Sequence, residues 1–227
     1  MKRKPAFLFD LNGTMIDDME YHIRAWHRIL NDLGAHLSYE ETKQQCYGKN
    51  NELLERTFPG RFSDEEKHRM SMEKEHQYQQ AFRPHLKLIN GLERFLEEAK
   101  AAEISMAIGS AAIMFNIDFV INGLKLAPYI DAVVSADDVE WSKPHPETFL
   151  KCAKLLGVDP LDCIVFEDSP KGVEAAAAAG MKSVVITSMH TPDEFPDHST
   201  ILHFISDYQQ LFCKDLVLNE ERAYFGN

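Results

Sequence analysis

Cysteine is scarce in this chain of 227 residues, and no two cysteines stand close together in the sequence. The absence of a short-spaced pair argues against a disulfide scaffold and a zinc cluster, and it is typical of a reducing compartment. No apolar run approaches the length of a membrane span. No small-residue cleavage site follows the basic N-terminus, so we expect no signal peptide. These absences predict a cytoplasmic protein.

Positive charge is also in deficit, because 24 basic residues face 36 acidic ones and leave a net charge of -12. A surface that negative repels nucleic acid and anionic lipid, so we expect neither as a partner. It repels phosphorylated molecules at long range as well, and a phosphate site would need local cations or a metal. We expect a monomer or weak dimer.

What the chain does contain is an alternation of short apolar runs and amphipathic stretches. The runs predict strands at 6–9, 104–108, 132–135, 163–166 and 183–186. The stretches predict helices at 91–102, up to about 124, at 146–156 and at 172–179. Strands and helices that alternate with short connections predict an α/β fold with a doubly wound parallel sheet.

A polar, helical segment interrupts this alternation after the first strand. Apolar residues recur at helical spacing from 17 to 33, and Gly34 closes that helix. Ser38 to Glu41 and Ser63 to Glu66 have the pattern of capping boxes, which start helices. We therefore expect a core domain at 1–16 and 88–227 and an inserted α-helical cap domain at 17–87.

The residues just past the predicted strands are the candidates for chemistry, because ligands of such sheets bind at the carboxyl ends of the strands. Three carboxylates that converge there would repel one another unless a cation lies among them. Oxygen ligands of this kind suit magnesium. The candidates are Asp10, Asn12, Ser110, Lys143, Glu167 and Asp168.

The same residues carry a resemblance to a known family. Asp10-Leu11-Asn12-Gly13-Thr14, Ser110, Lys143-Pro144 and Glu167-Asp168-Ser169 resemble the four motifs of the haloacid dehalogenase-like hydrolase superfamily, in the expected order. The segment from Tyr21 to Trp26, together with the helical insertion, is similar to the β-phosphoglucomutase group with its small helical cap. The resemblance implies a Rossmann-like core.

The resemblance also implies roles for single residues. Asp10 would attack phosphorus and form an aspartyl phosphate. Mg²⁺ would be held by Asp10, Asp168 and the backbone carbonyl of Asn12, with Glu167 binding it directly or through water. Ser110 and Lys143 would bind the transferring phosphoryl oxygens. The remaining positions that the family pattern marks for substrate binding are Thr14, His22, Gly48, Lys74 and Ala111.

The inserted segment matches the group less closely. His22 matches a histidine of the hinge region, and Lys74 falls near a substrate-binding lysine, although a solvated helix lysine explains Lys74 equally well. Asn51 stands where the mutase has an arginine in its cap. That departure weakens the case for a sugar-phosphate mutase, which needs cations in the cap to grip a second phosphate.

Asn12 is the departure that matters most, because phosphatases and mutases of this family carry Asp there as general acid and base. An amide cannot transfer a proton at neutral pH, and losing such a group typically costs about 10²–10⁴-fold in rate. The backbone carbonyl of residue 12 is kept, so the metal site can survive. Either the residue was substituted to trap a ligand, or it is native to a divergent member.

Four functions follow from these observations. The first is a Mg²⁺-dependent phosphatase or phosphomutase that acts on a small ester such as a sugar phosphate. The second, motivated by Asn12, is a catalytically silent protein that binds a phosphometabolite. A dehalogenase is the third, but it needs no metal, so Glu167 and Asp168 argue against it. Phosphonate hydrolysis is the fourth, with Lys49 or Lys74 as the Schiff-base lysine.

Overall fold

Six parallel strands form the centre of the molecule, in the order β3-β2-β1-β4-β5-β6. The computed structural model describes residues 5–195 and 199–216 of the chain. Five strands lie where the sequence predicts them, and the sixth was missed. The strands are β1 (Ala6–Phe9), β2 (Met106–Gly109), β3 (Ala132–Val134), β4 (Cys163–Glu167), β5 (Lys182–Ile186) and β6 (Ile201–Ile205). The predicted α/β fold with a parallel sheet is confirmed.

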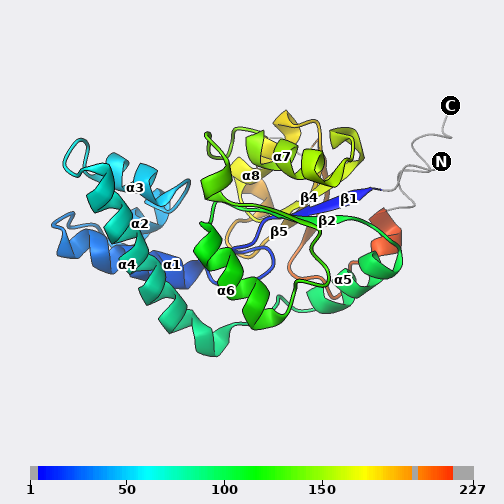
Figure 1. Cartoon of the computed structure of the whole chain (residues 1–227), viewed down its shortest axis with the longest axis horizontal. Coiled ribbons are helices and arrows are strands. Elements are labelled where there is room, and N and C mark those ends of the chain that lie inside the picture. The colour runs from blue at the N-terminus through cyan, green and yellow to red at the C-terminus, as the bar shows by residue number, and fades with distance from the viewer. Residues whose placement is uncertain (1–4, 196–198, 217–227) are drawn as a thin grey trace.

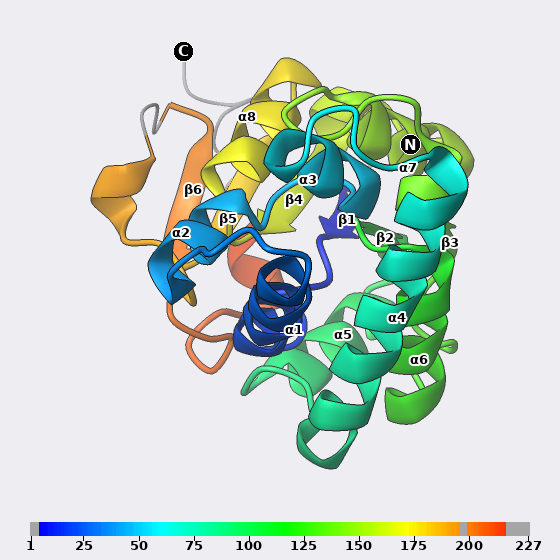
Figure 2. The same cartoon turned by 90° about the vertical axis from the view of Figure 1, so that its left-hand side faces the viewer.

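Helices cover both faces of this sheet, as in a doubly wound fold (Figure 2). Alternate residues of β1 point to opposite faces: Phe7 and Phe9 pack in one buried cluster, and Leu8 packs in another. The first cluster includes residues of α5 (Leu92–Ala101) and α6 (Met114–Leu124). The second includes residues of α7 (Glu147–Leu156) and α8 (Pro170–Ala178).

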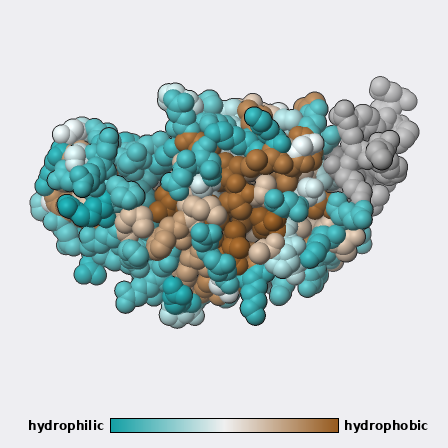
Figure 3. All heavy atoms as spheres, in the orientation of Figure 1, coloured by the Kyte–Doolittle hydropathy of each residue, from teal (hydrophilic) through white to brown (hydrophobic). Residues whose placement is uncertain are grey.

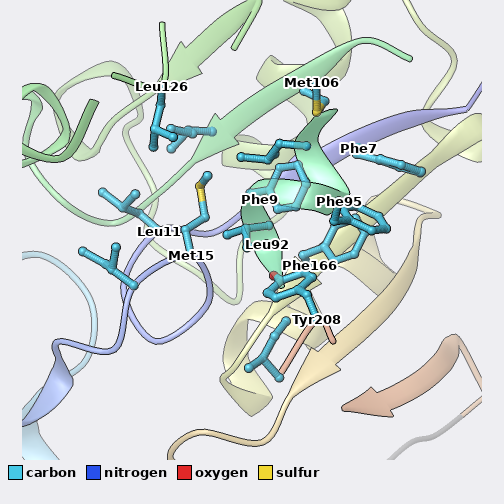
Figure 4. Close-up of a cluster of buried hydrophobic side chains, with 14 of the residues drawn as sticks. Phe7, Phe9, Leu11, Met15, Leu92, Phe95, Met106, Leu126, Phe166 and Tyr208 are labelled. Carbon is cyan, nitrogen blue, oxygen red and sulfur yellow. The ribbon is translucent and has the colours of Figure 1, made fainter. Parts of the chain in front are cut away.

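Aromatic rings pack around Phe9 at the carboxyl end of β1 (Figure 4). Phe9 stacks on Phe166 with ring centroids 4.5 Å apart, and Phe95 lies edge-on to both. Tyr208 completes the group and donates a 3.1 Å hydrogen bond to the carbonyl of Thr14. Close-packed aromatic pairs of this kind resist displacement. The loop that follows β1 is therefore held at its start by Phe9 and again at Thr14.

The inserted segment contains four α-helices gathered at one end of the molecule (Figure 1). They are α1 (Met19–Asp32), α2 (Tyr39–Gln45), α3 (Asn50–Thr57) and α4 (Asp64–Phe82). Both predicted capping boxes form, at Ser38 and at Ser63. The helices bury a cluster of their own that includes Trp26, Leu30 and Leu54. We propose that they are the cap domain expected at 17–87, and we call them the cap.

The chain crosses between cap and sheet twice, and the two crossings lie side by side. Ile16 and Leu88 form an antiparallel bridge there, and the amide of Ile89 donates to the carbonyl of Met15. On the face shown in Figure 3 the cap is mostly hydrophilic, and hydrophobic residues gather over the sheet part. Within the described residues no helix is long and apolar enough to span a bilayer.

Candidate active site

Three carboxylates meet where β1 and β4 end. The two strands are neighbours, and their register pairs Phe9 with Phe166, so Asp10 emerges beside Glu167 and Asp168. One ligand atom from each of these three acids lies within 4.8 Å of the others, and all three side chains are buried. The convergence expected from the sequence is therefore present.

Lys143 joins the acids from the loop that follows β3. Its Nζ lies 2.6 Å from Asp10 Oδ1 and 2.7 Å from Glu167 Oε1, and it also donates to the carbonyl of Gly109 at 3.1 Å. The other oxygen of Glu167 accepts 2.8 Å hydrogen bonds from the amides of Asp168 and Ser169. We call Asp10, Lys143, Glu167 and Asp168 the strand-end cluster.

Two glycines make room for this cluster. Gly13 has φ +75°, and a Cβ there would stand 2.1 Å from Asp168 Oδ2. A Cβ on Gly172 would stand 1.8 Å from Glu167 Oε1. A side chain at either position would displace a carboxylate, so the backbone is shaped around the acids.

The cluster holds more negative charge than its lysine can balance. Burial raises the pKa of Asp10 to about 7; Lys143 opposes this shift, and the charge of Glu167 adds to it. Burial and the neighbouring charges of Glu167 and Asp10 hold the pKa of Asp168 well above its usual range. Such a set of buried oxygen donors fits a divalent cation, and magnesium prefers these ligands.

A cavity of about 560 Å³ opens on the strand-end cluster and extends under the cap. The residues proposed for substrate binding line it with one exception. Those that line it are His22, Gly48, Lys74, Ser110, Ala111 and Lys143. Thr14 is fully buried and is absent from the lining, so its proposed role has no support in this geometry.

Asn12 also lines the cavity, and its side chain points to a carboxylate that the sequence interpretation missed. Asn12 Nδ2 donates a 2.6 Å hydrogen bond to Asp18 Oδ2 and lies 3.1 Å from His22 Nε2. Asp18 is the N-cap residue of α1, yet its side chain makes no capping hydrogen bond. The hydroxyl of Tyr78 donates to the same Asp18 oxygen at 2.5 Å.

Lys74 lies in a buried chain of polar groups, so its interpretation as a solvated lysine is wrong. Its Nζ is 2.7 Å from His22 Nδ1 and 3.0 Å from both oxygens of Glu75. Glu75 also accepts 2.6 Å hydrogen bonds from the amides of Asn50 and Asn116. We call Asp18, His22, Lys74 and Glu75 the cap cluster.

The charge of Glu75 is compensated, in contrast to the acids at the strand ends. Burial alone would raise its pKa, but the attraction of Lys74 and His22 and the two amide hydrogen bonds lower it to about 2. Asn116 belongs to α6, so Glu75 also ties the cap to the sheet part. In the sequence, the one hint of this buried polar chain is that Glu75 directly follows Lys74.

Comparison with known proteins identifies the class to which this fold and site belong. The family described as haloacid dehalogenase-like hydrolase matches residues 7–186, and the chain belongs to that family. The crystal structure of β-phosphoglucomutase from Clostridium difficile has a TM-score of 0.84 and 27% sequence identity, with 99% of this chain and 100% of that chain covered.

Relatives with named activities indicate which kind of enzyme within the family this chain is. The fructose-1-phosphate phosphatase YqaB of Escherichia coli is 29% identical over 187 residues, which cover 81% of this chain and 96% of the relative. The β-phosphoglucomutase of Bacillus subtilis is 29% identical over 186 residues, 79% and 81% of the two chains. The chain is thus an enzyme of the phosphohydrolase or phosphomutase kind.

Proposed function

We propose that the chain is a Mg²⁺-dependent phosphatase that removes phosphate from a small sugar or polyol monophosphate by way of an aspartyl phosphate on Asp10. The observation that carries the proposal is the strand-end cluster, three buried carboxylates and one lysine facing a cavity of about 560 Å³. The named phosphatase and mutase relatives agree with this chemistry.

Asp10 is the nucleophile in this proposal because it lines the cavity and Lys143 fixes its Oδ1 at 2.6 Å. Ser110 and Lys143, which line the same cavity, would bind the phosphoryl oxygens. A positioned carboxylate turns one difficult displacement into two easier ones. Each step then depends on correct orientation, on local charge and on transfer of a proton.

The metal would be held by the carboxylates of Asp10 and Asp168 and by the backbone carbonyl of Asn12. Both oxygens of Glu167 are already bonded, one to Lys143 and one to backbone amides. Glu167 would therefore reach the metal through water while it orients Lys143. When bound, Mg²⁺ would neutralise the charge of the phosphate and align it with Asp10.

Water is the acceptor we favour, because two of the three cap lysines that line the cavity, Lys49 and Lys74 but not Lys43, are held by other groups. Asn51, which stands where the mutase has an arginine, is exposed and does not line the cavity. Lys49 donates to the carbonyl of Val139, and Lys74 is held by Glu75 and His22. A mutase needs cationic groups that are available to the second phosphate of its bisphosphate intermediate.

A screen of sugar and polyol phosphates with Mg²⁺ tests the proposal, with phosphate release as the readout. We expect release from one or more monophosphates and none without the metal. Saturable binding of such esters with no release, even from an activated aryl phosphate, would favour the second candidate, a silent phosphometabolite-binding protein. The amide at residue 12 is the observation that favours this alternative.

A further inference from the structure

The cap cluster contains a connected path for a proton that ends beside residue 12. His22 lines the cavity, and its Nε2 is 3.1 Å from Asn12 Nδ2 and 3.2 Å from Asp18 Oδ2. An oxygen atom bonded to the Asn12 amide could thus be bonded to His22 Nε2 as well. That is the place where the leaving oxygen of a substrate meets the general acid in a phosphatase of this family.

The hydrogen bonds define where the protons of this path lie. A nitrogen–nitrogen contact of 2.7 Å, as between Lys74 and His22 Nδ1, needs one donor and one acceptor. An ammonium group can only donate, so Nδ1 accepts and Nε2 carries the imidazole proton. In the absence of substrate this proton faces Asp18 Oδ2 at 3.2 Å, and the Asn12 amide nitrogen at 3.1 Å is a neighbouring donor, not its partner. Lys74 Nζ therefore stands behind His22 as a second proton source, with Glu75 on its far side at 3.0 Å.

Asp18 is placed to hold this path rather than to cap its helix. It is fully buried, and its Oδ2 receives Tyr78, Asn12 and His22, whereas its Oδ1 has no hydrogen-bond partner. Burying a carboxylate is costly unless it is hydrogen-bonded or paired, and the three contacts at Oδ2 supply that compensation. The His22 ring is clamped further by stacking on Tyr78, with centroids 3.8 Å apart.

We propose that His22 is the proton-transfer residue of this site, supplied by Lys74 and positioned by Asp18, in place of the carboxylate that residue 12 lacks. The inference rests on the proposed phosphatase function. His22 would touch the reacting oxygen and is a catalytic residue; Asp18 acts through it and is a positioning residue.

The relay balances over the two steps. In the first, Asp10 bonds to phosphorus as the ester P–O bond breaks, the leaving oxygen takes the Nε2 proton of His22, and a Lys74 proton moves to Nδ1. In the second, water bonds to phosphorus as the bond to Asp10 breaks. The proton of this water goes to Nε2, and the Nδ1 proton returns to Lys74. One ester and one water give one alcohol and one phosphate, and the site is restored.

The relay is tested by comparing an alkyl phosphate, whose alkoxide must be protonated as it leaves, with an activated aryl phosphate, whose phenolate leaves unaided. His22→Gln should slow alkyl ester hydrolysis by about 10²-fold or more and leave the initial burst of phenolate nearly unchanged. His27→Gln, on the same helix outside the cavity lining, is the matched control and should change neither.

Two further variants separate a relay from a structural role. Lys74→Arg keeps the charge but does not give up a proton, so it should show the same alkyl-selective loss. Asn12→Asp supplies an acid directly, so it should restore alkyl hydrolysis in the His22→Gln and Asp18→Asn backgrounds. Rescue by a carboxylate at residue 12 would not follow if these variants merely damaged the fold.

Equal losses on both esters, no loss on either, or failure of Asn12→Asp to rescue would overturn the relay. A parent chain that yields neither a phenolate burst nor alcohol would instead contradict the phosphatase function, and the relay would fall with it. The two failures are distinguishable because the burst depends on Asp10 and the metal, and the relay acts only on proton-dependent steps.

Discussion

The strand-end cluster and the cap cluster contain similar residues, but their charges are balanced differently. The first gathers three buried carboxylates around Lys143, and the pKa of Asp10 and of Asp168 is raised. The second alternates acids and bases, Asp18–His22–Lys74–Glu75, and the pKa of Glu75 is lowered. Uncompensated charge makes the first a site for a cation and a phosphate. Internal compensation makes the second a fixed frame.

The largest effect should come from the strand-end cluster. Asp10→Asn removes the nucleophile, because an amide does not attack phosphorus, and we expect turnover of every phosphate ester to be lost. The fold should persist, since Asn fills the same space and relieves charge repulsion. Activity assays with a thermal melt of the same sample check both statements, and retained turnover would exclude the covalent route through Asp10.

Asn12 lies between the two clusters, and Asn12→Asp places an acid there. In the His22→Gln background we expect hydrolysis of ordinary sugar phosphates to rise by as much as about 10²–10⁴-fold, with a much smaller gain for an activated aryl phosphate. In the parent the gain should be smaller, because His22 already transfers the proton. The new acid would stand beside Asp18, whose Oδ2 is 2.6 Å from the present amide. Two such carboxylates share a proton. Side-by-side steady-state assays on both esters measure the gain in the two backgrounds, and no turnover of either ester in any of these proteins would favour the silent alternative.

Glu75→Gln tests whether the charge pair of the cap cluster stabilises the fold. Removing the charge leaves buried Lys74 without its carboxylate, and breaking a buried pair costs about 3–5 kcal/mol in free energy of unfolding. The folded pKa of Glu75 is about 2 and the ordinary value 4.5, so the ionised form stabilises the fold above pH 4.5. This contribution is lost as the pH falls toward 2.

Urea unfolding of the parent and of Glu75→Gln across this pH range is the measurement. The difference between the two proteins should be full at pH 7 and should narrow below pH 4.5. Glu73→Gln, on the exposed face of the same helix, is the control. A difference that stays constant down to pH 3 would mean that the ion pair does not stabilise the fold.

Magnesium should stabilise the strand-end cluster and leave the cap cluster unaffected. At one hundred times its dissociation constant, an ion that binds only the folded chain adds about 2.7 kcal/mol. We expect a clear rise in melting temperature with Mg²⁺, and no rise in Asp168→Asn. Glu75→Gln should keep the rise from its lower baseline. A shift that survives in Asp168→Asn would place the ion elsewhere.

The same contrast explains what the sequence predicted. Asp10, Glu167 and Asp168 lie at the ends of buried strands, and neighbouring parallel strands bring their carboxyl ends together. The strand-end cluster could therefore be predicted from the order of strands and acids along the chain. The core strands were equally predictable because most of their residues are apolar. β6 was missed because it is a half-buried edge strand interrupted by His203.

The cap cluster could not be read in this way, because its members meet only through helix packing. Asp18 looks like an ordinary N-cap residue, and Glu75 like one acid among many in a polar helix. Nothing in the spacing shows that α4 turns Lys74 inward onto His22, fifty-two residues earlier. Lys74 points to His22 because α4 packs against α1.

Trapping the phosphoenzyme tests the central claim most directly. The chain would be mixed with Mg²⁺ and an activated aryl phosphate, quenched in acid, digested and analysed by mass spectrometry. With His22→Gln, which lacks the base of the second step, we predict a burst of one phenolate per chain and a phosphoryl group on Asp10, both absent without Mg²⁺. A burst with the label on another residue, or turnover with Asp10 never labelled, would contradict the account.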